Sequence, residues 1–251
     1  MERPLTPRTE NEMICVPLGF GGELVEATFL ARPNRFLVEA ELDGAVVQAH
    51  LADRGRLRET LVPGARLLLA RRPPEGRKTC FQAVAAVADR DRLVSLDTHL
   101  PNRLILAALR AGALPHFAGY TSVRPEARSG HSRFDFLLEG PEGRCVLEVK
   151  SAGYVAGGVA LFPDAPTGRG LRHLEELGAL AQAGQRAAVL FAAQGDAQAV
   201  AMNTAIDPAF AAGLERAMAA GVEVYAFACP LSRAGIMLGA EIPVRRALED
   251  Q

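Results

Sequence analysis

The first ninety residues alternate between short apolar runs and turn signals. Dipeptides such as Asp43-Gly44, typical of a two-residue β-hairpin, separate the runs. Five runs have the length and composition of strands: Glu23–Leu30, Arg35–Leu42, Ala45–Leu51, Arg66–Ala70 and Phe81–Val87. Five short strands with few helix-length segments predict a small β-barrel of the OB type over residues 21–90.

From about Arg92 the pattern changes to helices mixed with strands. Three helices are expected, over Pro101–Ala111, from the N-cap Thr167 to Ala183, and over Pro208–Ala220. Strands are expected at Thr121–Glu126, Ser132–Glu139, Arg144–Ser151, Val159–Phe162, Arg186–Ala192, Val222–Ala228 and Ile236–Leu238. This order predicts an α/β sheet with helices on its faces, over residues 91–251.

The beginning of the chain and its cysteines favour a cytoplasmic protein. Residues 1–10 are polar and carry acids, so we expect no signal or transit peptide, and a flexible tail over residues 1–20. No apolar run reaches the roughly 18 residues of a spanning helix, so no membrane contact is expected. The four cysteines form no CxxC pair, which favours reduced thiols over a zinc site.

Charge is unevenly distributed, although the net charge is only −1. Between His50 and Cys80 the chain has three acids and eight basic residues: Arg54, Arg56, Arg58, Arg66, Arg71, Arg72, Arg77 and Lys78. This excess predicts a phosphate-facing patch, with a merely solvated face as the alternative. The phenylalanines of this half are expected to fill the barrel: Phe20, Phe29, Phe36 and Phe81.

Lysine is scarce, which draws attention to Lys150. Of 28 basic residues only Lys78 and Lys150 are lysines, so the ammonium at these positions can have a role that a guanidinium cannot fill. Lys150 follows Glu148 by two residues at the end of an apolar run, and Asp135 lies thirteen residues before Glu148. An Asp followed by Glu-x-Lys on a neighbouring strand is typical of metal-dependent nucleases.

Strand geometry predicts how these side chains meet. If residues 140–143 form a hairpin loop, Asp135 lies opposite Glu148 and Arg133 opposite Lys150, with Cβ atoms roughly 4.5–5.5 Å apart. The like charges repel unless a cation lies between the acids and a phosphate against the bases. Oxygen ligands favour one or two Mg²⁺ or Mn²⁺ ions, which acidify water and offset phosphate charge. An ordinary surface salt bridge is the alternative.

Arg169 and His173 share a helix face at i, i+4 spacing near the start of the second helix. They point at the site or cap the first helical turn.

Several segments together resemble the sugar fermentation stimulation protein family (SfsA): Thr98–Arg103, Arg133–Leu138, Glu148–Ser151 and Ala160–Leu174. The resemblance implies an OB-like domain followed by a PD-(D/E)XK restriction-endonuclease-like domain. It also implies that Asp135 and Glu148 bind the metal and that Lys150 is the catalytic lysine. The family is regarded as DNA-binding and is linked to sugar (maltose) metabolism.

One departure from the family keeps three functions open. Many members carry Glu in the helix that opens the nuclease domain, whereas Leu104–Arg110 has no acid. Three hypotheses are open. The chain is a Mg²⁺- or Mn²⁺-dependent DNA endo- or exonuclease, a non-catalytic DNA-binding regulator with a vestigial site, or an RNA-processing enzyme. We favour binding of single- or double-stranded DNA, and a homodimer is compatible with cutting both strands. The expected nucleic-acid contacts are Arg54, Arg56, Arg58, Lys78, Arg133, Arg169 and His173.

Overall fold

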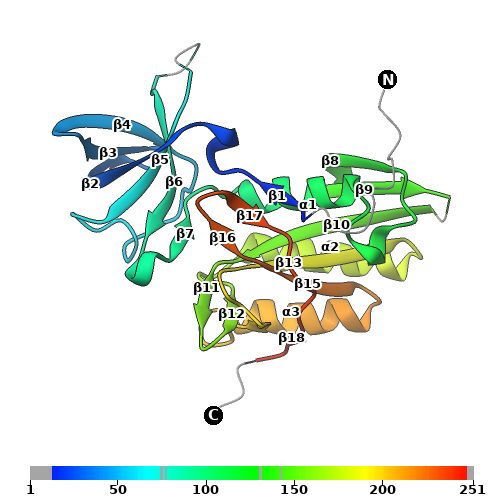
Figure 1. Ribbon diagram of the computed structural model, residues 1–251. Coiled ribbons are helices and arrows are strands. Elements are labelled where there is room, and N and C mark those ends of the chain that lie inside the picture. The colour runs from blue at the N-terminus through cyan, green and yellow to red at the C-terminus, as the bar shows by residue number, and fades with distance from the viewer. Residues whose placement is uncertain (1–12, 74–75, 77, 130–131, 142, 248–251) are drawn as a thin grey trace. The chain divides into compact units, whose positions relative to one another are not determined.

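A computed structural model describes residues 13–73, 76, 78–129, 132–141 and 143–247 (Figure 1). The chain divides into two units. The barrel unit comprises Cys15–Leu100 and Leu231–Met237. The sheet unit comprises Pro101–Pro230, together with residues 13–14 and 238–247 of the described chain.

The barrel unit is built on a closed five-stranded barrel. Its strands follow the order β4-β3-β2-β5-β6, and a parallel pairing of β4 with β6 closes the ring. In chain order the elements are β1 (Cys15–Val16), η1 (Leu18–Gly21), β2 (Leu24–Asn34), β3 (Leu37–Leu42), β4 (Ala45–Leu51), β5 (Arg66–Arg71), β6 (Phe81–Val87), η2 (Asp89–Asp91), β7 (Leu93–Ser95), β16 (Leu231–Ser232) and β17 (Gly235–Met237). The OB-like barrel predicted from the sequence is confirmed.

Alternating side chains explain why these runs close into a barrel. In β3, Val38 and Ala40 are fully buried, while Glu39 and Glu41 point away from the interior. The same alternation in the other strands gives one apolar core of Val, Leu, Ala and Phe side chains inside the barrel.

The tail predicted over residues 1–20 is wrong from Cys15 onward. Cys15 and Val16 form β1, which pairs with β17, and Leu18 in η1 is buried. Residues 1–12 lie outside the described residues. The segment Leu231–Met237, expected within the second domain, also pairs in the barrel unit.

The sheet unit contains a five-stranded sheet in the order β15-β13-β10-β9-β8 and a smaller sheet in the order β11-β12-β14-β18. Strands β10, β13 and β15 are parallel, whereas β9 is antiparallel to both of its neighbours. The elements are α1 (Leu100–Arg110), η3 (Pro115–Phe117), β8 (Ser122–Ser129), β9 (Ser132–Gly140), β10 (Gly143–Ala152), β11 (Tyr154–Ala156), β12 (Val159–Phe162), α2 (Gly168–Gln182), β13 (Arg186–Gln194), β14 (Ala199–Met202), α3 (Pro208–Ala219), β15 (Glu223–Cys229) and β18 (Val244–Arg245). The predicted α/β sheet with helices on its faces is confirmed.

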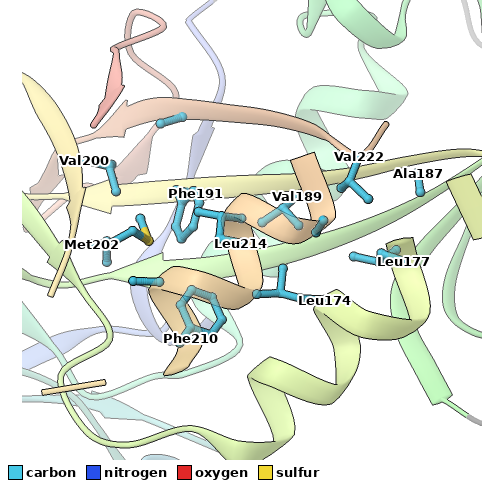
Figure 2. Close-up of a cluster of buried hydrophobic side chains, with 14 of the residues drawn as sticks. Leu174, Leu177, Ala187, Val189, Phe191, Val200, Met202, Phe210, Leu214 and Val222 are labelled. Carbon is cyan, nitrogen blue, oxygen red and sulfur yellow. The ribbon is translucent and has the colours of Figure 1, made fainter. Parts of the chain in front are cut away.

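Helices α2 and α3 cover one face of the five-stranded sheet. Their apolar side chains meet those of β13 in one buried cluster: Leu174, Leu177, Phe210, Leu214, Val189 and Phe191 (Figure 2). Helix α2 begins at the predicted N-cap, where the side chain of Thr167 accepts a hydrogen bond from Gly170 N. Helix α3 is capped by Asp207, whose side chain accepts a hydrogen bond from Phe210 N. This packing determines which face of α2 is turned towards β9 and β10.

Among the helices in the described part of the chain, none is long and apolar enough to cross a membrane.

Candidate functional site

Side chains from four elements of the sheet unit come together where the β9–β10 ladder ends. Strand β9 supplies Asp135, β10 supplies Glu148 and Lys150, α1 supplies Asn102, and α2 supplies His173. Their side-chain hydrogen bonds form two groups: Asn102 with Asp135, and Lys150 and His173 with Glu148.

The hairpin register agrees with the prediction up to the site. Arg144 pairs with Glu139, and the ladder runs as far as Leu147 opposite Phe136. At the next position the carboxylate of Asp135 takes over the role of a backbone acceptor, because its Oδ2 accepts the Val149 N–H at 2.8 Å. The acid of β9 is therefore held at the point where the two strands separate.

The surroundings of Asp135 disfavour the charged form of its carboxylate. Burial and the negative charge of Glu148 raise its pKa to about 6, against hydrogen bonds from Val149 N and Asn102 that favour the charged form. Asn102 Nδ2 donates to Asp135 Oδ1 at 2.6 Å. A positive charge beside this pair of acids would relieve the repulsion.

Glu148 is 5% exposed and is held by two donors on one oxygen. Its Oε1 accepts from Lys150 Nζ at 2.7 Å and is 2.6 Å from His173 Nδ1. Burial opposes ionisation, but the hydrogen bonds from His173 and Lys150 outweigh it and lower the pKa of Glu148. Lys150, expected to face a phosphate, is thus turned towards Glu148, with 11% of its side chain exposed.

The tautomer of His173 follows from its two neighbours. Arg169 Nε can only donate, and it lies 3.3 Å from His173 Nε2, so this nitrogen is an acceptor. The ring proton is then on Nδ1, which donates to Glu148. The sequence predicted contact of His173 with nucleic acid, but its ring is 4% exposed and both nitrogens bond protein groups. That prediction is corrected to a role in holding Glu148.

Arg133 does not lie against Lys150 as the strand geometry suggested. Its guanidinium bonds Glu126 on β8 through both the side-chain and the backbone oxygen. The β9–β10 ladder ends at Leu147 and Phe136, before Arg133 could pair with Lys150. Glu126 has a left-handed backbone conformation, φ 54°, and is skipped in the β8–β9 register. Arg133 remains exposed at the edge of the sheet.

The other predicted basic contacts fall into two groups. Arg169 is exposed at the start of α2, beside the site. Four others belong to the barrel unit and are exposed there: Arg54, Arg56, Arg58 and Lys78. Arg77 of the same predicted patch lies outside the described residues.

Asn102 is the site residue that the sequence did not reveal. Residues Leu104–Arg110 have no acid, and the α1 side chain that reaches Asp135 is the amide of Asn102, just before that segment. Its only signal in the sequence was its place in the segment Thr98–Arg103 shared with a known family.

The donor set is limited to two carboxylates. Within the described part of the chain no three His, Cys, Asp or Glu side chains form a cluster that could hold a metal. The donors Lys150 and His173 both reach Oε1 of Glu148, so Oε2 is the oxygen that they leave for a cation. A cation bound here would therefore take its protein ligands from these two carboxylates and fill its other coordination positions with water or substrate oxygens.

Two family models match the chain. The one described as "Sugar fermentation stimulation protein RE domain" matches residues 99–235, and "SfsA N-terminal OB domain" matches residues 30–96. The first contains Asp135, Glu148 and Lys150, and the second contains Arg54, Arg56 and Arg58.

Relatives and a solved structure agree with these matches. A sugar fermentation stimulation protein homolog from Chloroflexus aurantiacus is 56% identical, over 92% of this chain and 89% of the relative. One from Moorella thermoacetica is 49% identical, over 88% and 97%. The structure of Pyrococcus furiosus SfsA in complex with Ca²⁺ is 29% identical with a TM-score of 0.81, covering 92% of this chain and 99% of that one.

Proposed function

This chain belongs to the sugar fermentation stimulation protein family, and from that premise we propose that its restriction-endonuclease-like domain is a divalent-metal-dependent nuclease acting on DNA. The observation that carries the proposal is the arrangement of Asp135, Glu148 and Lys150 at one opening of the β9–β10 ladder.

The acids fit a hard cation that keeps several waters. Burial and the negative charge of Glu148 raise the pKa of Asp135, and the positive charge of Lys150 offsets this rise only in part. Mg²⁺ and Mn²⁺ bind through one or two carboxylates, with water in the remaining positions. Asp135 and Glu148 would hold such an ion. The Ca²⁺ complex of the Pyrococcus relative supports a divalent-cation site in the family.

When bound, the cation offsets charge on the phosphate and lowers the pKa of a water. Lys150 contributes an ammonium that Glu148 fixes in place, where it can stabilise negative charge developing on the phosphate oxygens. Asn102 and the Val149 N–H orient Asp135, and His173 orients Glu148. In the hydrolysis a water oxygen bonds to phosphorus, the bond from phosphorus to one sugar oxygen breaks, and a water proton ends on that oxygen.

Each unit has basic side chains that could contact phosphates of a nucleic acid. Arg169 donates its Nε–H to His173 and is exposed beside the acids, so its outer edge can reach a phosphate. Arg54, Arg56, Arg58 and Lys78 supply positive charge on the barrel unit. Arg133 is occupied by Glu126 and would have to exchange that partner for a phosphate.

A non-catalytic DNA-binding regulator is the second candidate, and Asn102 favours it. The α1 side chain that reaches Asp135 is an amide, so it adds no charge to the metal site. A site with two carboxylates binds a cation more weakly than one with three, which is the expected course of a nuclease site that has become vestigial.

Cleavage assays distinguish these functions. We would incubate single-stranded, nicked, branched and duplex DNA, and single-stranded RNA, with Mg²⁺ or Mn²⁺ and compare wild type with Asp135→Asn. The variant should fold, because the introduced amide keeps an oxygen acceptor for Val149 N–H and the Asn102 amide can rotate to accept from the new NH₂ group. Glu139→Gln is the matched control, since Glu139 is an acid of the same strand that pairs with Arg144 away from the site.

We expect wild type and Glu139→Gln to cut DNA and Asp135→Asn to lose cleavage while still binding. Equal cutting by wild type and Asp135→Asn would disprove the assigned site. Binding without cutting in all three proteins would favour the regulator, and cutting confined to RNA would change the substrate class.

A further inference from the structure

An exposed phenylalanine lies at the hairpin between β2 and β3. The sequence predicted that all four phenylalanines of this half fill the barrel, and Phe29 and Phe81 do so, with 4% and 8% exposure. Phe36 is instead 37% exposed, with its backbone N–H bonded to Asn34 Oδ1 in the turn. A large apolar ring held at the surface by a hydrogen-bonded turn is a candidate contact for a ligand.

Two arginines lie on the Phe36 ring. The guanidinium carbons of Arg35 and Arg54 are 4.8 Å and 5.1 Å from the ring centroid, within the range of cation–π contact. Both arginines are exposed. The ring and the two guanidinium planes therefore form a layered group that carries two positive charges.

The loop that carries Arg54 is fixed by a third arginine. Arg32 Nη1 donates to the carbonyls of Gly55 and Arg56, and its Nη2 donates to those of Asp53 and Arg35. Asp53 Oδ1 also accepts the Gly55 N–H at 2.7 Å, which closes a turn within the loop. One guanidinium thus ties the loop after β4 to the β2–β3 hairpin, so the layered group is built before any ligand arrives.

Acidic side chains confine the positive charge to this rim of the barrel. On the outer side of β3 the chain places Glu39 and Glu41, and Glu39 Oε1 accepts a hydrogen bond from Gln48 of β4. A phosphate backbone laid across the middle of these strands would meet both acids. The rim carries Arg35, Phe36 and Arg54, and the following loop carries the exposed Arg56 and Arg58.

We propose that this arginine–phenylalanine rim binds an unpaired nucleotide stretch, with a base stacked on Phe36 or on a guanidinium beside it and Arg54, Arg56 and Arg58 along the phosphates. In a duplex both faces of each base are covered by its neighbours, whereas an unpaired strand offers free faces to stack on aromatic rings and guanidinium planes. The rim therefore selects single-stranded nucleic acid. The inference rests on the proposed function only in that the ligand is a nucleic acid, and it does not require cleavage.

The test is binding in EDTA, where cleavage plays no part. Fluorescence anisotropy would measure binding to three labelled ligands: an oligothymidylate, the same strand with abasic sites in place of the bases, and a blunt duplex. The oligothymidylate has about 15 nucleotides, near the upper end of the site size of one OB fold. Phe36→Ala should weaken binding to oligothymidylate by about 10-fold, the loss of one stacked base, and leave the abasic strand unaffected. Arg54→Gln should weaken both strands and make the salt slope shallower by about 0.7.

Further variants separate stacking from folding. Phe36→Leu keeps an apolar side chain without a flat ring and should lose as much affinity as Phe36→Ala, whereas Phe36→Trp should retain it. Phe20→Ala is the matched control, because Phe20 is 60% exposed with Arg72 over its ring on another element of the same unit. Melting temperatures should be unchanged in all of them.

Three results would overturn the proposal: a preference for duplex, an equal loss on the abasic strand, or a loss in Phe20→Ala as large as in Phe36→Ala. The metal site is tested separately by the cleavage assay with Asp135→Asn, whereas Glu139→Gln, away from that site, should bind oligothymidylate in EDTA as wild type does. Failure of the rim therefore leaves the nuclease proposal untouched, and failure of cleavage leaves the rim untouched.

Discussion

At the residue scale the candidate site depends on Glu148. Lys150 and His173 both donate to Oε1, which fixes the carboxylate plane and leaves its second oxygen as the edge for a cation. His173 itself is held from behind by Arg169. A partner that orients a metal-binding side chain in this way affects metal affinity without touching the metal.

This arrangement predicts that His173→Leu weakens divalent-cation binding by about 10- to 100-fold, the usual cost of removing an orienting partner. The reason is that Glu148 loses one of the two donors that hold its buried carboxylate in position. Isothermal titration of metal-free protein with Mn²⁺ or Ca²⁺ measures the change directly.

His173→Asn supplies the control, because the introduced amide nitrogen can occupy the place of Nδ1 and still donate to Glu148. It should recover most of the affinity lost in His173→Leu. If both variants melt at lower temperature but bind the cation as wild type does, His173 has only a packing role.

At the scale of elements the sequence predicted the parts governed by local pattern. The pairing of Arg144 with Glu139 follows from period-2 alternation and a short turn, and the start of α2 follows from Thr167 as N-cap. The alternation of side chains along the strands, together with the hairpin loop, also predicted that Asp135 lies opposite Glu148.

The parts that the sequence did not predict depend on contacts between distant segments. Asn102 meets Asp135 across 33 residues of chain, and His173 meets Glu148 across 25. Helical spacing put His173 on one face with Arg169 but did not identify Glu148 as its partner, and nothing in the periodicity of α1 singles out Asn102. Arg133 was misplaced because the β9–β10 ladder ends before it and Glu126 of β8 holds its guanidinium.

The starts of β13 and β15 are joined by an ion pair that makes stability depend on pH. Glu223 accepts from Arg186 and from Tyr225, and although burial opposes it these hydrogen bonds lower the pKa of Glu223. A carboxylate with a lowered folded pKa stabilises the fold above its ordinary value near 4.5 and loses that contribution as the pH falls through the folded value.

Glu223→Gln should therefore reduce the free energy of unfolding at pH 7 by about 1 kcal/mol, since the pair is partly exposed and screened by solvent. The difference from wild type should shrink as the pH falls from 4.5 through the lowered folded pKa, where the wild-type carboxylate is protonated too. Urea titrations at several pH values measure it. Glu215→Gln, in an exposed pair with Arg246, should show a smaller effect at pH 7. A Glu223→Gln effect that did not shrink at acid pH would contradict the assignment.

At the scale of the whole molecule, each unit holds one part of the proposed function, the acids in the sheet unit and the arginine–phenylalanine rim in the barrel unit. The units are not simply consecutive in sequence. The chain leaves the sheet unit after β15, adds β16 and β17 to the barrel unit, and returns at Leu238. Ile236 of β17 is fully buried, pairs with Val16 of β1 and Leu231 of β16, and so belongs to the folded state of the barrel unit.

Ile236→Ala should therefore destabilise the barrel unit although the residue lies near the end of the sequence. Truncating a buried isoleucine to alanine typically costs about 2–5 kcal/mol. Hydrogen exchange should show lost protection in β5 and β6, while β13 in the sheet unit keeps its protection, because the buried cluster that contains β13 shares no residue with the cluster of β5 and β6. Met218→Ala, at a half-exposed position of α3, should leave both units unchanged. An equal loss of protection in β6 and β13 would show instead that the two units unfold together as one.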